Sequence, residues 1–150
     1  MKLPIIAGAM VLAFVAEGAM AACSAPGTQV RDTGANTDLT DLLTGNTVCV
    51  GSSPVWTAQE EHRAGGDLYD YKLGASDPVD PTKKLGTWAT TGNGNNSIVT
   101  YTYDTFGTAV SYSFKVYEAN AAAGTYDFCG VAANDVEGAT VKPGLGPCLP

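Results

Sequence analysis

The stretch SIVTYTY, residues 97–103, alternates between large apolar and small polar side chains, and the stretch YSFKVY, residues 112–117, repeats the pattern. Successive side chains of a β-strand point to opposite faces of the sheet. Val99, Tyr101 and Tyr103 therefore share one face. Both stretches are rich in β-branched and aromatic residues, which favour strands. The pattern predicts two half-buried strands whose inner face is largely aromatic.

The same composition recurs between short clusters of Gly, Pro, Asn and Asp, which favour turns. Most connections are too short for crossover helices, so successive strands are expected to pair as antiparallel hairpins. Such a meander leaves exposed edges unless its sheet closes on itself. We therefore expect an all-β fold, a meander of about six to eight strands that closes into a small up-and-down barrel, with a two-sheet sandwich as the alternative. The predicted strands are Thr47–Val50, Val55–His62, Asp67–Leu73, Thr87–Thr91, Ser97–Tyr103, Ala109–Glu118, Thr125–Cys129 and Val136–Val141.

The first 21 residues have the layout of a secretory signal peptide. Lys2 gives a basic start, Leu3–Val15 is apolar and uncharged, and Ala19 and Ala21 form a small-x-small cleavage pattern. The apolar run is shorter than the roughly 20 residues that a membrane helix needs. We expect cleavage after residue 21, export to the periplasm or the extracellular space, and no permanent membrane span.

Four cysteines in an exported chain predict two disulfides. Cys49 and Cys129 each lie on the less apolar side of a predicted strand, which favours a Cys49–Cys129 bridge on the outer surface. Cys23 would then pair with Cys148 and tie the two ends of the chain together. The alternative for Cys23 is lipidation, because Met20–Cys23 resembles a bacterial lipoprotein processing site.

The rest of the chain predicts one domain. Residues 22–46 read as an irregular lead-in with a short helix over Thr37–Leu43, residues 47–141 as the barrel domain, and residues 142–150 as a Gly/Pro-rich tail. The net charge of −7, with only eight Lys and Arg, leaves no basic patch to neutralise phosphates. We expect no nucleic acid partner.

The stretch WTAQEEHR, residues 56–63, holds the only histidine and is the first candidate for acid–base chemistry. In an extended strand, Trp56, Glu60 and His62 share the inner face, while Glu61 and Arg63 face outward as surface charges. A carboxylate beside an imidazole serves proton transfer, so Glu60 and His62 are the candidate catalytic residues. No serine or cysteine nucleophile completes a triad. The structural interpretation, an ion pair in which Glu60 raises the pKa of His62, is the one we prefer.

Asp77 and Asp80 are candidate ligands for a hard cation such as calcium, because both carboxylates lie in one Pro-stiffened loop. Two carboxylates are an incomplete ligand set, and the adjacent Lys83 and Lys84 oppose a cation. We interpret the segment as a hairpin loop and expect no cofactor.

The many aromatic residues on predicted strands raise the hypothesis of a site for a small apolar or aromatic ligand. Core packing explains most of them, but tyrosine hydroxyls inside a small barrel need hydrogen-bonding partners. Those partners are a bound ligand or the polar residues of the inner face. The candidate ligand-binding residues are Trp56, Glu60, His62, Tyr71, Trp88, Tyr101 and Tyr112.

The ordered motifs LLTGNTVC (42–49), QEEHR (59–63), DYK (70–72), DPVDPT (77–82) and GTW (86–88) resemble those of a group of small exported proteobacterial proteins. That resemblance implies bacterial export and a compact disulfide-bonded β domain, and it carries no assigned activity. A looser resemblance is to lipocalin-like barrels, in which a Gly-x-Trp motif lies on a strand that helps to close the barrel. Here the motif lies in the middle of the chain.

Three functions fit these observations. The first is a non-catalytic binding module for a small apolar or aromatic ligand or a protein partner. The second is a structural or protease-inhibitor-like protein of the cell envelope, and the third is an enzyme that uses Glu60 and His62. A cavity of about 300 Å³ or more favours the first function, and a packed interior favours the second.

Overall fold

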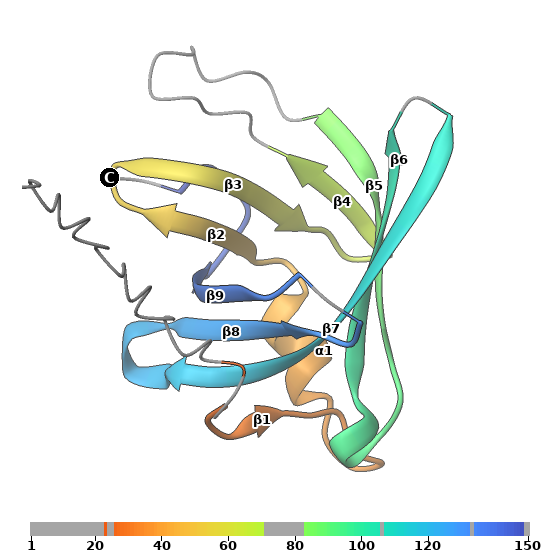
Figure 1. Ribbon diagram of the computed structural model, residues 1–150, viewed down its shortest axis with the longest axis vertical. Helices are drawn as coiled ribbons and strands as arrows, with labels where there is room; N and C mark the ends of the chain where they lie inside the picture. The colour runs from red at the N-terminus through yellow and green to blue at the C-terminus, as the bar shows by residue number, and fades with distance from the viewer. Residues whose placement is uncertain (1–22, 24–25, 71–82, 106, 133, 149–150) are drawn as a thin grey trace, which may run out of the picture.

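The computed structural model describes residues 23, 26–70, 83–105, 107–132 and 134–148, so the expected signal peptide lies outside the described residues (Figure 1). The described chain is mostly β-strand, with one short α-helix near its start. The elements are β1 (Gln29–Val30), α1 (Asp38–Leu43), β2 (Thr47–Ser52), β3 (Val55–His62), β4 (Asp67–Asp70), β5 (Lys83–Thr91), β6 (Ile98–Thr105), β7 (Thr108–Asn120), β8 (Thr125–Gly130) and β9 (Val136–Lys142), with 3₁₀ turns at Gly94–Asn96 and Ala121–Ala123.

The strands from β2 to β9 form a closed antiparallel barrel of eight strands. Each of these strands pairs with the next along the chain, and β9 pairs back with β2. This arrangement confirms the predicted up-and-down barrel, and the sandwich alternative is not adopted. The additional strand β1 pairs antiparallel with Val116 and Tyr117 of β7. These residues follow Phe114, the last residue of β7 that pairs with β6.

Most strand positions follow the sequence pattern, and β3 has the predicted bounds. The clearest difference is β5, which begins at Lys83, four residues before the predicted start at Thr87. Lys83 and Lys84 extend the strand because they pair with Asp70 and Tyr69 of β4 after an irregularity in the register. The part of the predicted strand Asp67–Leu73 beyond Asp70 lies outside the described residues.

The interior of the barrel holds the side chains that alternation assigned to the inner face. Val99, Phe114 and Val116 are almost fully buried, and Tyr101 is only 4% exposed. Cross-strand neighbours share a face, so Val99 with Phe114 and Val48 with Val141 extend this surface round the barrel. The core cluster consists of Leu39, Leu43, Val48, Leu68, Trp88, Val99, Tyr101, Phe114, Val116, Phe128, Ala139 and Val141.

Helix α1 adds its apolar face to the barrel core, since Leu39 and Leu43 are fully buried there. Thr37 lies directly before the helix but does not cap it with its side chain, because its hydroxyl donates to Asp41. Asp32 takes that role, and its Oδ1 accepts from the backbone N–H groups of Leu39 and Thr40 at 2.9 and 3.0 Å. In the described part of the chain, no helix is long and apolar enough to cross a membrane.

The two predicted disulfides form, but the predicted pairing was wrong. Cys23 is bonded to Cys129 and Cys49 to Cys148, with Cα separations of 5.4 and 6.0 Å. The reason is that β9 lies between β2 and β8 in the sheet. Cys49 and Cys129 are therefore about two strand spacings apart, roughly 10 Å, which exceeds the reach of a disulfide.

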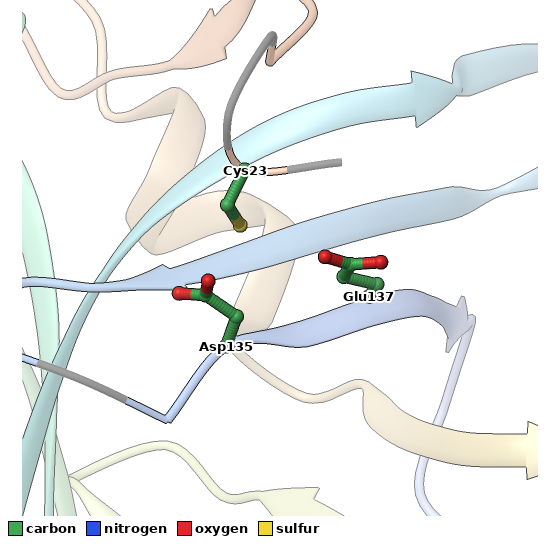
Figure 2. A group of neighbouring side chains, drawn as sticks. All are labelled: Cys23, Asp135 and Glu137. Atoms are coloured by element: carbon green, nitrogen blue, oxygen red, sulfur yellow. The ribbon is translucent and has the colours of Figure 1, made fainter. Parts of the chain in front are cut away.

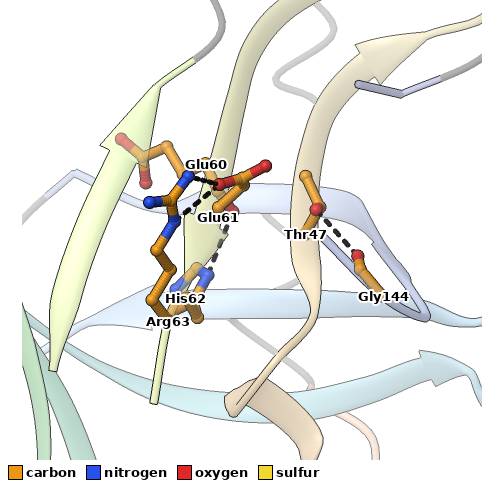
Figure 3. Close-up of polar contacts among 6 residues, drawn as sticks. All are labelled: Thr47, Glu60, Glu61, His62, Arg63 and Gly144. Carbon is orange, nitrogen blue, oxygen red and sulfur yellow. Dashed lines mark hydrogen bonds and ion pairs between the residues drawn. The ribbon is translucent and has the colours of Figure 1, made fainter. Parts of the chain in front are cut away.

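The Gly/Pro-rich segment after β9 folds back over the outer face of β2 and β3. The hydroxyl of Thr47 donates to the carbonyl of Gly144, as Figure 3 shows, and the backbone N–H of Cys148 donates to Oε1 of Gln59. Thr47 and Gln59 are fully buried as a result. The predicted tail is thus an ordered strap that the Cys49–Cys148 disulfide holds in place.

Removing the disulfide of this strap with Cys49→Ser and Cys148→Ser should lower the free energy of unfolding by roughly 3–5 kcal/mol, because the bridge joins residues far apart in the chain and restricts the unfolded state. Urea unfolding of the double variant measures the loss. Peptide mapping without reduction should recover Cys49 with Cys148 and Cys23 with Cys129. A peptide pair that joins Cys49 to Cys129 would contradict this structure.

Candidate functional site

The stretch QEEHR divides its charged side chains between the two faces of β3, as predicted. Glu60 and His62 face the interior, and Glu61 and Arg63 face outward and form an ion pair (Figure 3). Glu61 was expected to be a solvated surface charge, yet it is only 2% exposed. Its carboxylate accepts from Nε and Nη2 of Arg63 at 2.9 and 2.7 Å, and the Arg63 guanidinium stacks on the ring of Tyr69. The outer pair is therefore structural.

His62 is fully buried, and both of its ring nitrogens are hydrogen-bonded. Nδ1 lies 3.1 Å from the main-chain carbonyl oxygen of Glu60. Because a carbonyl oxygen only accepts, Nδ1 carries the proton and donates. Nε2 then accepts from the hydroxyl of Tyr101 at 2.9 Å. The two contacts select one neutral tautomer of His62.

The expected ion pair between Glu60 and a protonated His62 is not formed, and the expected rise in the pKa of His62 was wrong. Burial lowers the pKa of His62 to about 4, although its contact with the carbonyl of Glu60 acts in the opposite direction. The charged imidazolium is disfavoured because the buried ring has no contact with water, packed as it is against Trp88 and Tyr101 at 5.2 and 5.4 Å between centroids. His62 is therefore a neutral core residue at physiological pH.

The carboxyl group of Glu60 has a different partner, the hydroxyl of Tyr103, which donates to Oε1 at 2.8 Å. The pKa of Glu60 is raised to about 7, chiefly by burial; the Tyr103 hydrogen bond lowers it, and the negative charge of Asp70 on the neighbouring strand raises it. Glu60 therefore exchanges a proton near neutral pH, at a position inside the barrel.

A pocket of about 60 Å³ lies beside Glu60 within the barrel. At one end of the barrel β7 extends beyond β8, because β8 pairs with β7 only from Phe114 onward. Tyr112 is on the inner face beyond that point and is 38% exposed. The pocket is lined by Val48, Val50, Glu60, Tyr101, Tyr103, Phe114, Phe128 and Val136.

Two of the seven candidate ligand-binding residues line this pocket, namely Glu60 and Tyr101. Trp88 and His62 do not line it; they pack against each other, and the indole N–H of Trp88 donates to the carbonyl of Arg63. Trp56 is partly buried in β3, four residues before Glu60, and does not line the pocket. Tyr112 contacts the ring of Tyr103 at 6.0 Å between centroids without lining the pocket. Tyr71 lies outside the described residues.

Sequence reasoning missed six lining residues, although the signal for some of them was present. Alternation assigned Tyr103 to the inner face, and the same rule applied to Phe114 and Phe128 gives inner positions, yet alternation could not tell which inner residues surround a space. Only the pairing of strands around the closed barrel decides this. The other missed residues are Val48, Val50 and Val136.

The two catalytic candidates do not form an acid–base pair in this structure. Glu60 presents its main-chain carbonyl to His62, and its carboxyl group bonds to Tyr103. His62 does not line the pocket and has no free ring nitrogen with which to reach a substrate. The candidate metal ligands Asp77 and Asp80 lie outside the described residues.

Cys23, Asp135 and Glu137 place three potential ligand atoms within 4.8 Å of one another, as Figure 2 shows. The sulfur of Cys23 is bonded to Cys129, however, and metal binding by cysteine requires a thiolate. Asp135 also accepts a hydrogen bond from the backbone N–H of Gly130. The group fits a disulfide flanked by surface carboxylates better than a metal centre.

Comparison with protein-family models, curated proteins and solved structures gives no match for this chain. The resemblance to small exported proteobacterial proteins therefore stays a prediction. A functional proposal must start from the pocket and from the buried polar groups around it.

Glu60 and His62 should give the stability of the fold opposite dependences on pH. The pKa of His62 falls from 6.5 to about 4 on folding, so its contribution is full above pH 6.5 and is lost as the pH falls through 4. The pKa of Glu60 rises from 4.5 to about 7, so its contribution is full below pH 4.5 and is lost as the pH rises through 7. In the wild type the two effects oppose each other.

Single substitutions should separate these effects. In Glu60→Gln the free energy of unfolding should fall by about 3 kcal/mol between pH 7 and pH 4 relative to the wild type, because only the His62 effect remains. In His62→Gln a fall of similar size should occur as the pH rises from 4.5 to 7.5. Urea unfolding of the three proteins across this range measures both slopes. Parallel pH profiles for all three proteins would refute the assignment.

Proposed function

We propose that the protein is an exported, non-catalytic binding module whose barrel accepts a small apolar group at its open end. The observation that carries the proposal is the pocket of about 60 Å³ inside the barrel. Aliphatic and aromatic side chains from five strands line it, together with the carboxyl group of Glu60. Binding sites for small molecules are typically concave and mostly apolar, with few polar groups that orient the ligand.

The size of the pocket restricts what it can hold. A water molecule needs roughly 10–15 Å³ measured in this way, so the space takes about four water-sized groups. A branched alkyl group, the end of a longer ligand or one side chain of a protein partner has this size. Because the pocket is open, the remainder of such a ligand stays outside the barrel.

Export is supported by the two disulfides, Cys23–Cys129 and Cys49–Cys148. Disulfides persist in oxidising compartments such as the periplasm and the extracellular space. The signal-like pattern over residues 1–21 points to the same destination.

The alternative is a structural or protease-inhibitor-like protein of the cell envelope. One observation favours it, because the pocket is well below the roughly 300 Å³ of a typical ligand site. The rest of the interior is packed with core side chains such as Leu68, Val99 and Val116. This alternative requires no occupant of the pocket.

A small neutral probe, tert-butanol, distinguishes the two functions. We expect its addition to shift the NMR signals of Val48, Val50 and Val136 with saturable binding. Val136→Phe should abolish the binding, because the larger side chain fills the pocket that Val136 lines.

The matched control is Leu145→Phe, which makes a similar change at a residue that is 48% exposed and remote from the pocket lining. This control should bind the probe like the wild type. Shifts that do not saturate, or that persist in Val136→Phe, would reject the binding module and leave the envelope protein as the better account.

A further inference from the structure

The walls of the pocket are unusually aromatic for its size. Tyr101, Tyr103, Phe114 and Phe128 contribute four of the eight lining side chains. Their rings contact one another, with centroid separations of 5.8 Å for Tyr101 and Phe114, 6.4 Å for Tyr101 and Tyr103, and 6.3 Å for Phe114 and Phe128. The face of an aromatic ring carries negative potential, so a group of rings attracts a cation that lies against them.

The charge of the carboxyl group inside the pocket is negative, like the potential at the ring faces. Glu60 is the one ionisable carboxyl group of the lining, and Asp70 lies directly across from it on β4. Oε1 of Glu60 accepts from Tyr103, while Oε2 has no hydrogen-bonding partner among the described residues. The ion pairs of Arg63 with Glu61 and of Lys84 with Asp67 do not include Glu60.

We propose that this pocket binds a small organic cation, a methylated or alkyl-substituted ammonium group, with Glu60 as its counter-ion and the four aromatic rings as its wall. The proposal rests on the proposed function and names the class of ligand. A volume of about 60 Å³ suits such a group, because an ammonium with three or four methyl groups has a similar number of heavy atoms. A bare metal ion is a poorer fit, since the pocket offers a single carboxylate and mostly apolar walls.

Binding of a cation should be coupled to the proton on Glu60. Burial and the charge of Asp70 raise the pKa of Glu60, which is about 7. The other polar groups that face it are the hydroxyls of Tyr101 and Tyr103, whose own pKa values are raised, and the buried His62 nearby is neutral. A cation stabilises the carboxylate, so it binds more tightly above pH 7 and displaces the proton below it.

Tetramethylammonium and tert-butanol make a matched pair of probes, because both have five heavy atoms in a compact shape and only the first is charged. NMR titration of the wild type at pH 8.5 should give tighter binding of tetramethylammonium than of tert-butanol. At pH 5.5 the affinity for tetramethylammonium should be at least about tenfold weaker, while that for tert-butanol should stay within twofold. This comparison requires no substitution.

Glu60→Gln should weaken the binding of tetramethylammonium at pH 8.5 by about tenfold and make it independent of pH, because the neutral amide keeps the shape and loses the charge. The control Asp104→Asn removes an exposed carboxylate from the same end of β6 and should bind like the wild type.

The outcomes separate this proposal from the proposed function. Equal affinities for the two probes, or an affinity for tetramethylammonium that does not change with pH, would refute the proposal of a cationic ligand. The proposed apolar binding module would not be affected by that result. Failure of both probes to bind the wild type would overturn both proposals.

Discussion

The pairing of β2 with β9 is the contact on which the rest of the structure depends, because it joins the first strand of the barrel to the last. It is short, with three residue pairs that match Thr47–Cys49 to residues 140–142. The Cys49–Cys148 disulfide and the strap that it anchors reinforce this seam from outside. Without the seam, β2 and β9 would each present an unpaired edge, and the inner faces of the strands would not converge.

Closure also creates the contacts that determine the chemistry of the interior. β3 and β6 are separated by two strands in the sheet, and they meet only across the lumen. There His62 bonds to Tyr101 and Glu60 to Tyr103, at sequence separations of 39 and 43 residues. Two parallel pairs of a tyrosine hydroxyl and an ionisable group thus bridge the barrel. One holds a neutral imidazole in the packed half, and the other holds a titrating carboxyl at the pocket.

Much of the fold could be predicted from the sequence because each strand carries its own alternation. The pattern over Val55–His62 and over residues 97–103 predicts both the strands and the inner residues correctly. The disulfide pairing could not be predicted in the same way, because it depends on β9 lying between Cys49 and Cys129. The protonation state of His62 could not be predicted either, because its partner Tyr101 lies across the barrel and is far from it in the sequence. Local patterns predict faces, whereas pairing across space determines partners and pKa values.

The free-energy penalty on the charged form of the buried Glu60 carboxyl group is the feature that bears most directly on function. A carboxyl group whose pKa is raised to about 7 has its charged form penalised by its surroundings, and an apolar residue at the same place would avoid that penalty. The neighbouring strand increases the cost by placing Asp70 opposite. His62, by contrast, is neutral, and both of its ring nitrogens have partners, so packing alone accounts for it. Perturbed carboxyls that face a pocket are enriched at functional sites, because the same field that penalises the charge strengthens its attraction for an opposite one. Under the proposed binding function, a bound cation would relieve this unfavourable position of Glu60.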